Sequence, residues 1–171
     1  VVLACNTASA VCLPSLADEL PIPVFGVVQP GAKAAVEAAG GDSLIAVIAT
    51  EATIASNAYK NAIFSLDARP AVVQLACPLF VPLVEEGLDQ TPTIVEPVMA
   101  RYLGPLKRLS PGVVVLGCTH YPILRDALTS FFGESVTLID SASSTAAAVE
   151  SALRARGALS VSTDPGNLHC Y

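Results

Sequence analysis

Short runs of β-branched and aliphatic residues recur along the chain, each bounded by glycine, proline or polar residues. Such a run is typical of a strand that is buried on both faces, as the strands of a parallel sheet are. We therefore expect six segments to form strands: 1–4, 24–28, 44–49, 71–76, 112–117 and 136–139.

Longer segments rich in alanine and leucine separate these runs and predict helices. Pro30 opens one of them and Gly40 closes it, in line with the preference for proline near helix starts and glycine after helix ends. A regular alternation of strand and helix predicts the α/β class, with parallel sheets flanked by helices. The predicted helices are 7–20, 31–39, 53–63, a short one ending at 85–87, 93–109, 121–132 and 143–156.

The composition excludes several classes of protein. Of the 171 residues, 53% are hydrophobic and 14% are charged, which excludes disorder and allows a large core. A net charge of −6 without a basic patch argues against a nucleic-acid partner. Apolar runs stay well short of the roughly 18–20 residues that cross a bilayer, so we expect no membrane partner either.

Five cysteines are present, with no C-x-x-C pair and no Cys/His spacing that suits a metal. We therefore expect neither a disulfide framework nor a metal site, and a reduced, cytoplasmic setting. Cys12 lies in an apolar helical segment and Cys77 precedes a proline, so both are expected to be structural, and Cys170 incidental.

Two of the cysteines lie in segments that resemble each other. Residues 1–7 (VVLACNT) and 114–120 (VVLGCTH) both run from a strand through a small residue to Cys5 or Cys118. Where a helix follows a strand, the backbone N–H groups and the dipole at the helix start are expected to favour the thiolate. They are therefore expected to lower the pKa of the cysteine thiol. Two matched thiols indicate a reaction with two mirror-related proton positions, such as inversion at a carbon centre.

The neighbouring side chains suit an amino-acid substrate. Short amide and hydroxyl groups can hold a carboxylate and an ammonium group, and His120 can tune Cys118. Structural roles stay open, namely helix capping by the amide and hydroxyl groups and packing by His120. The candidate binding residues are Asn6, Thr7, Thr50, Thr53 and Thr119.

The two cysteine segments, 4–10 and 116–122, resemble the paired motifs of glutamate racemases in the aspartate/glutamate racemase superfamily. The sequence C-T-H-Y-P at 118–122 is the glutamate form of the second motif. The resemblance extends to about residue 163. Further similar segments follow in the same order: 26–33, 50–54, 77–85 and 139–142.

This resemblance implies a cofactor-independent racemisation of glutamate that yields D-glutamate for peptidoglycan and the cell wall. Cys5 and Cys118 would be the two bases, His120 would assist Cys118, and Glu85 is a weaker assisting candidate. The substrate would be held by Asn6, Thr7, Thr50, Thr53 and Thr119.

The resemblance also implies two pseudo-symmetric α/β lobes with the active site in the cleft between them. Residues 1–28 and 138–171 would form the first lobe, and 29–137 the second. Relatives begin with a strand and a D-S-G-x-G-G turn that nothing here matches, and residues 162–171 do not resemble the usual ending. We therefore expect a fragment with an incomplete first lobe that is weakly active or inactive alone.

Two further functions are left open by the residues. A lyase or hydrolase on the same scaffold, such as a decarboxylase relative, would need only one of the two cysteines. A non-catalytic protein would bind glutamate, or regulate a partner, without proton exchange. A homodimer is also left open.

Overall fold

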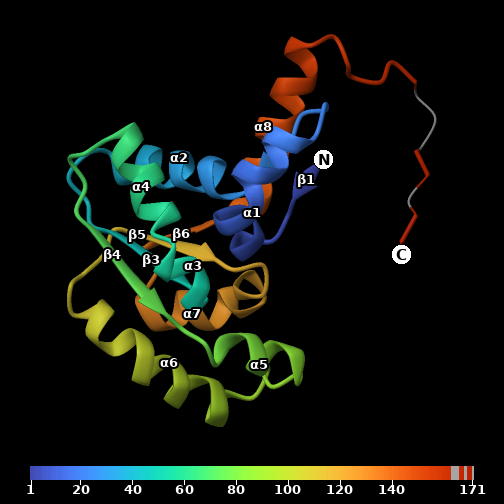
Figure 1. Ribbon diagram of the computed structural model, residues 1–171. Coiled ribbons are helices and arrows are strands. Elements are labelled where there is room, and N and C mark those ends of the chain that lie inside the picture. The colour runs from blue at the N-terminus through green and yellow to red at the C-terminus, as the bar shows by residue number, and fades with distance from the viewer. Residues whose placement is uncertain (163–165, 168, 171) are drawn as a thin grey trace.

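The computed structural model describes residues 1–162, 166–167 and 169–170, and it contains two parallel sheets (Figure 1). The smaller sheet pairs β1 with β2, and the larger has the strand order β4-β3-β5-β6. The strands are β1 (Val2–Leu3), β2 (Phe25–Gly26), β3 (Ile45–Ala49), β4 (Val72–Ala76), β5 (Val113–Gly117) and β6 (Thr137–Asp140).

Helices connect these strands, as parallel pairing requires. The predicted α/β class, with parallel sheets flanked by helices, is confirmed. The helices are α1 (Asn6–Glu19), α2 (Val28–Ala39), α3 (Glu51–Ala55), α4 (Ala58–Leu66), α5 (Phe80–Glu85), α6 (Pro92–Lys107), the 3₁₀ helix η1 (Tyr121–Leu124), α7 (Arg125–Phe132) and α8 (Ser141–Ala155).

The larger sheet is buried on both faces. Helices α2 and α4 cover one face, and α6 and α7 lie on the other (Figure 1). Every residue of β3 is fully buried, with alternate side chains in two separate apolar clusters. Ile45 and Val47 pack with α2 and α4, whereas Ala46 and Ile48 pack with α5, α6 and α7. Burial on both faces explains why the strand sequences are continuous apolar runs.

The register of the larger sheet determines which residues meet at its carboxyl edge. Ala49 pairs with both Ala76 and Gly117, the last residues of β4 and β5. Thr50, Cys77 and Cys118 are the next residues in each segment, so all three leave the sheet at the same edge. In open α/β sheets this is the edge at which ligands bind.

Several predicted elements differ from the structure, and of the strand predicted at 1–4 only Val2–Leu3 forms β1. The strand predicted at 24–28 is only Phe25–Gly26, because Val27 has helical dihedrals and α2 begins at Val28. The helix predicted at 53–63 is divided into α3 and α4 at Asn57, whose φ of 54° is left-handed. Asparagine tolerates this conformation better than most residues. The segment at 121–132 begins with the 3₁₀ helix η1.

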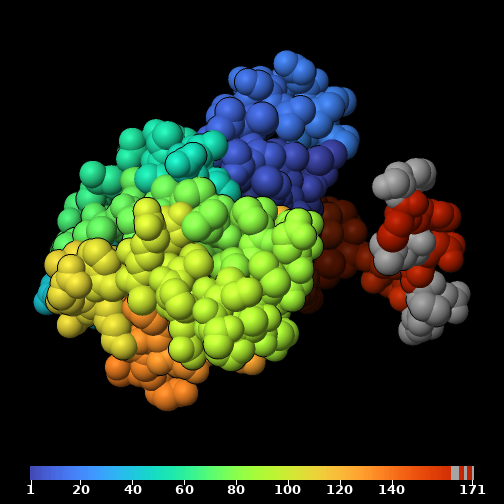
Figure 2. Space-filling view, turned by 90° about the horizontal axis from the view of Figure 1, so that it is seen from below, coloured from blue at the N-terminus to red at the C-terminus, as the bar shows by residue number. Residues whose placement is uncertain are grey.

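The smaller sheet and α1 project from one end of the larger body, as the blue residues in Figure 2 show. Strand β6 pairs with β5, so the strand after residue 136 belongs to the larger sheet, and α8 then packs against α2. The division into lobes 1–28 with 138–171 and 29–137 stays a prediction, and residues 163–165, 168 and 171 of it lie outside the described residues. Among the described residues, no helix is long and apolar enough to cross a membrane.

Candidate functional site

The ends of two strands place the two cysteines of the matched motifs. Cys118 follows β5 and is buried, with 7% of its surface exposed. Cys5 is the residue before α1, at the end of the smaller sheet, and is exposed. Cys5 raises the pKa of Cys118 electrostatically, so the two thiols lie within interaction range. The structure therefore brings together two residues that are far apart in the sequence.

Burial raises the pKa of the Cys118 thiol above its ordinary value, and the nearby Cys5 raises it further. The backbone N–H groups of His120 and Tyr121 and the hydroxyl of Thr119 lower it in part. The expectation of a lowered pKa is therefore wrong for Cys118, because loss of hydration outweighs the hydrogen bonds. The thiol form is favoured at neutral pH.

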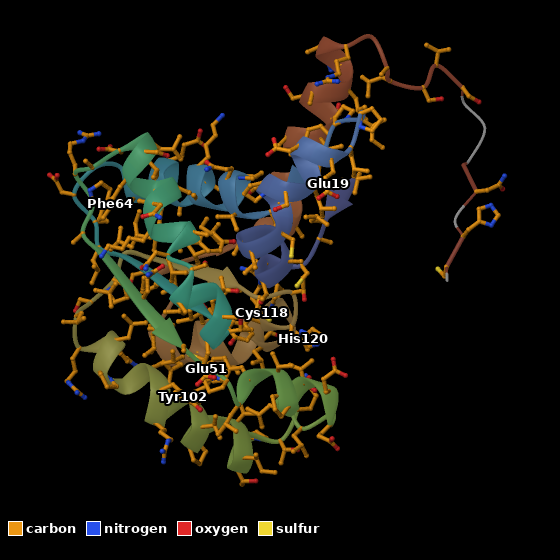
Figure 3. All side chains as sticks on the ribbon, viewed as in Figure 1. Glu19, Glu51, Phe64, Tyr102, Cys118 and His120 are labelled. Atoms are coloured by element: carbon orange, nitrogen blue, oxygen red, sulfur yellow. The ribbon has the colours of Figure 1, made fainter. Side chains whose placement is uncertain are left out.

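Cys118, His120 and Glu85 form a hydrogen-bonded chain. The Cys118 Sγ lies 3.8 Å from His120 Nδ1, and His120 Nε2 bonds to Glu85 Oε1 at the end of α5. Cys118 and His120 lie side by side in Figure 3. A carboxylate that orients an imidazole next to a thiol is the arrangement that assists proton transfer to and from that thiol. The Glu85 side chain is solvent-exposed, yet it has His120 as its partner.

Three threonine hydroxyls form a closed triangle. Thr7 Oγ1 lies 2.9 Å from Thr50 Oγ1 and 3.0 Å from Thr53 Oγ1, and the last two are 3.0 Å apart. Hydroxyl hydrogens rotate to suit their partners, so each of the three hydroxyls can donate a hydrogen bond to a carboxylate. The triangle joins α1 to the start of α3 and thus joins the two sheets' carboxyl ends.

Helix capping, the structural role left open for the amide and hydroxyl side chains, is found for some of these residues and not for others. Thr50 does cap α3, because its side chain accepts a hydrogen bond from the Thr53 backbone N–H at 3.3 Å. Asn6 and Thr7 do not cap α1: they are its first two residues, and the cap position belongs to Cys5, which makes no side-chain cap bond. The Asn6 side chain is instead buried, and its Nδ2 has no hydrogen-bond partner.

A mostly apolar cavity of about 760 Å³ lies between the smaller sheet, β5 and α8. Cys118 and Thr119 line it together with Ala4, the residue before Cys5. A smaller hollow of about 320 Å³ contains Glu85, Thr119 and His120. A third cavity, of about 550 Å³, lies between α6 and α7 and contains none of the predicted site residues. The two cavities that contain predicted site residues therefore both reach the carboxyl end of β5, where Thr119 lines each of them.

Tyr59 is not among the predicted site residues, yet its hydroxyl donates a hydrogen bond to Asn6. No local pattern marks this tyrosine, since it is the second residue of an ordinary amphipathic helix. Cys77 is buried in the larger core cluster, and its thiol contacts the Leu75 carbonyl at 4.0 Å. Among the described residues, no three His, Cys, Asp or Glu side chains are grouped so as to hold a metal ion.

Alkaline pH is expected to destabilise the protein through its buried thiols. Burial raises the pKa of Cys77 to about 12 and also raises the pKa of Cys118. Unfolded thiols ionise near pH ~8.5, so above that pH the folded state binds more protons and stability falls as pH rises. Between pH ~8.5 and 10 we expect the ionisation of Cys77 in the unfolded state to lower the free energy of unfolding by about 2 kcal/mol.

Urea unfolding at pH 7.5 and at pH 10 measures this effect. The variant Cys77→Ala is the control, and the difference between pH values is expected to be smaller in it by about 2 kcal/mol. An equal loss of stability in both proteins would show that Cys77 ionises normally in the folded state.

Comparison with known proteins identifies the family. The profile of the Asp/Glu/Hydantoin racemase family matches residues 1–151. The glutamate racemase of Lactiplantibacillus plantarum is 50% identical over 145 residues, which are 85% of this chain and 52% of the relative. The chain thus spans about half the length of this curated relative.

Solved structures of glutamate racemases are similar to the structure of this chain. Glutamate racemase isoform RacE1 of Bacillus anthracis has a TM-score of 0.89 and 39% identity, covering 96% of this chain and 61% of that one. The glutamate racemase of Francisella tularensis, solved in complex with D-glutamate, has a TM-score of 0.86 and 32% identity, covering 96% and 60%. The match over residues 1–151, together with two thiol motifs at the carboxyl ends of parallel strands, shows that this chain belongs to the Asp/Glu/Hydantoin racemase family.

Proposed function

We propose that the protein racemises glutamate without a cofactor, by moving the α-proton between two thiols. The pairing of Cys5 and Cys118 carries this proposal, because two matched motifs end parallel strands and their thiols interact electrostatically. Family membership supports the reaction class. The D-glutamate complex of the Francisella relative supports glutamate as the substrate.

In the proposed reaction, the thiolate of one cysteine takes the α-proton from one face of the bound amino acid, and the electron pair stays on Cα. The thiol of the other cysteine returns a proton to the opposite face, so the two residues exchange protonation states. Burial raises the pKa of Cys118, which suits it to hold and donate a proton in one direction. In the other direction, His120 with its Glu85 partner helps Cys118 to act as the base.

We assign substrate binding to the polar groups around the thiols. Asn6 Nδ2 is a buried donor without a partner, so a substrate carboxylate would satisfy it. The hydroxyls of Thr7, Thr50 and Thr53 offer further donors, and Thr119 lies next to Cys118 in the cavity. We further propose that the D-glutamate formed supplies peptidoglycan synthesis in the cytoplasm.

Incubation with L-glutamate in D₂O tests the proposal. We expect loss of the α-proton signal by NMR and formation of D-glutamate, weakly in the chain alone. A fusion that adds the part of the Lactiplantibacillus relative outside the match supplies the full length of that relative.

The variant Glu85→Gln is expected to slow the reaction about tenfold in the same assay, because His120 loses its charged partner.

The same assay distinguishes the alternatives. Exchange that depends on only one of the two cysteines would favour a one-thiol lyase or hydrolase. Glutamate binding without exchange, in both the chain and the fusion, would overturn racemisation in favour of a binding protein.

A further inference from the structure

Tyr59 of α4 is a fully buried tyrosine whose hydroxyl donates a hydrogen bond to Asn6 Oδ1 at 2.6 Å. The two residues are 53 positions apart and belong to different parts of the fold. Asn6 directly follows Cys5, so the bond ties the first cysteine segment to a helix that packs on the larger sheet.

The Tyr59 side chain also lies against the second cysteine segment. A Cβ on Gly117, the residue before Cys118, would come within 3.3 Å of Tyr59 Cε2, so glycine allows the ring to lie this close. On the other side, a Cβ on Gly31 would come within 3.1 Å of the Tyr59 hydroxyl. One side chain therefore contacts the residue after Cys5 and the residue before Cys118.

The bond determines how the Asn6 amide is oriented. Burial raises the pKa of Tyr59 far above its ordinary value, with a smaller opposing effect from Ser141, so the phenol stays protonated and acts as the donor. A donor requires the amide oxygen as its partner. The Asn6 Nδ2 group therefore points away from Tyr59, and it is buried without a hydrogen-bond partner.

We propose that Tyr59 is a positioning residue for the reaction. It holds the Asn6 amide so that Nδ2 donates to the substrate carboxylate, and its ring sets the spacing between the two cysteine segments. Tyr59 itself does not touch the substrate. This inference rests on the proposed racemisation, and it adds a residue that acts through Asn6.

The variant Tyr59→Phe tests the role of the hydroxyl while keeping the ring. We expect KM for glutamate to rise about 10- to 100-fold, the effect of misplacing one charge-assisted hydrogen bond, with a smaller change in kcat. Tyr102→Phe is the matched control, since it removes the same hydroxyl from a partly buried tyrosine of α6 that lies on the opposite face of the larger sheet from Tyr59. We expect both variants to fold, and KM to be unchanged in Tyr102→Phe.

A double-mutant cycle shows whether Tyr59 acts through Asn6. In an Asn6→Ala background, Tyr59→Phe is expected to change KM by less than about twofold, because the amide that it orients is gone. Independent, multiplicative effects of the two substitutions would overturn the inference, as would equal changes of KM in Tyr59→Phe and Tyr102→Phe.

A readout without turnover separates this inference from the proposed function. The side-chain amide signal of Asn6 in a ¹⁵N spectrum, assigned by its loss in Asn6→Ala, is expected to shift in Tyr59→Phe and to stay in place in Tyr102→Phe. If the wild-type protein does not exchange the α-proton, racemisation fails while this signal still tests Tyr59. An unchanged Asn6 signal in Tyr59→Phe overturns the positioning role even in an active enzyme.

Discussion

Replacing Cys118 by serine is expected to reduce racemisation by about 10²- to 10⁴-fold in both directions. In the proposed reaction each direction needs one thiol to remove the α-proton and the other to return one, so loss of either slows both directions. A serine hydroxyl keeps nearly the same shape but is far less acidic than a thiol, and it cannot take the proton at neutral pH. The buried position of Cys118 makes serine ionisation still less favourable.

Formation of D-glutamate from L-glutamate, followed with a chiral assay, measures this loss. The matched control is Cys12→Ser, because Cys12 is an exposed cysteine of α1 that takes no part in the proposed chemistry. We expect this control to keep the wild-type rate. Turnover of Cys118→Ser within tenfold of the wild type would exclude Cys118 as one of the two bases.

Replacing Phe80 by alanine is expected to destabilise the protein by about 3–5 kcal/mol. Phe80 is fully buried at the start of α5. Its ring packs edge-on against Tyr102 and Tyr121, with centroid distances of 5.8 Å and 5.2 Å. The substitution leaves a cavity beneath the segment that follows Cys118, and these contacts are lost with it.

Urea unfolding measures this change as a lower midpoint with an unchanged m-value. Phe64→Ala is the matched control, since Phe64 is 41% exposed on α4, with Lys60 Nζ 5.8 Å from its ring centre. We expect it to cost less than about 1 kcal/mol. A similar cost for both variants would mean that the core cluster around Phe80 is loosely packed.

The strands were the easiest elements to predict, and the smaller sheet shows where prediction weakened. The run at 112–117 contains β5, because a strand buried on both faces is apolar throughout. A continuous apolar run is visible in the local sequence without any knowledge of the tertiary structure. The strand predicted at 24–28 shrinks to two residues, since Val27 takes helical dihedrals to start α2. The break of the 53–63 helix at Asn57 was also missed, because asparagine is equally compatible with a continuous helix.

Local patterns and the family resemblance named the candidate site residues, but they did not give the electrostatics of Cys118. Local pattern marked Cys5 and Cys118, and resemblance to a family added Glu85, which does bond to His120. The direction of the Cys118 pKa shift was wrong, since the backbone donors are local while burial by surrounding elements is not. Tyr59 carried no signal in its own segment.

By itself, the sequence determined the α/β class, the succession of strands and helices, and the two cysteine motifs with their family. These features depend on the polarity and backbone preference of residues close together in the chain. Only the tertiary structure decided that Thr7 meets Thr50 and Thr53, that Tyr59 donates a hydrogen bond to Asn6, and that burial raises the pKa of Cys118. Contacts across 43 to 53 residues and the loss of water around a thiol arise from packing, which no local pattern encodes.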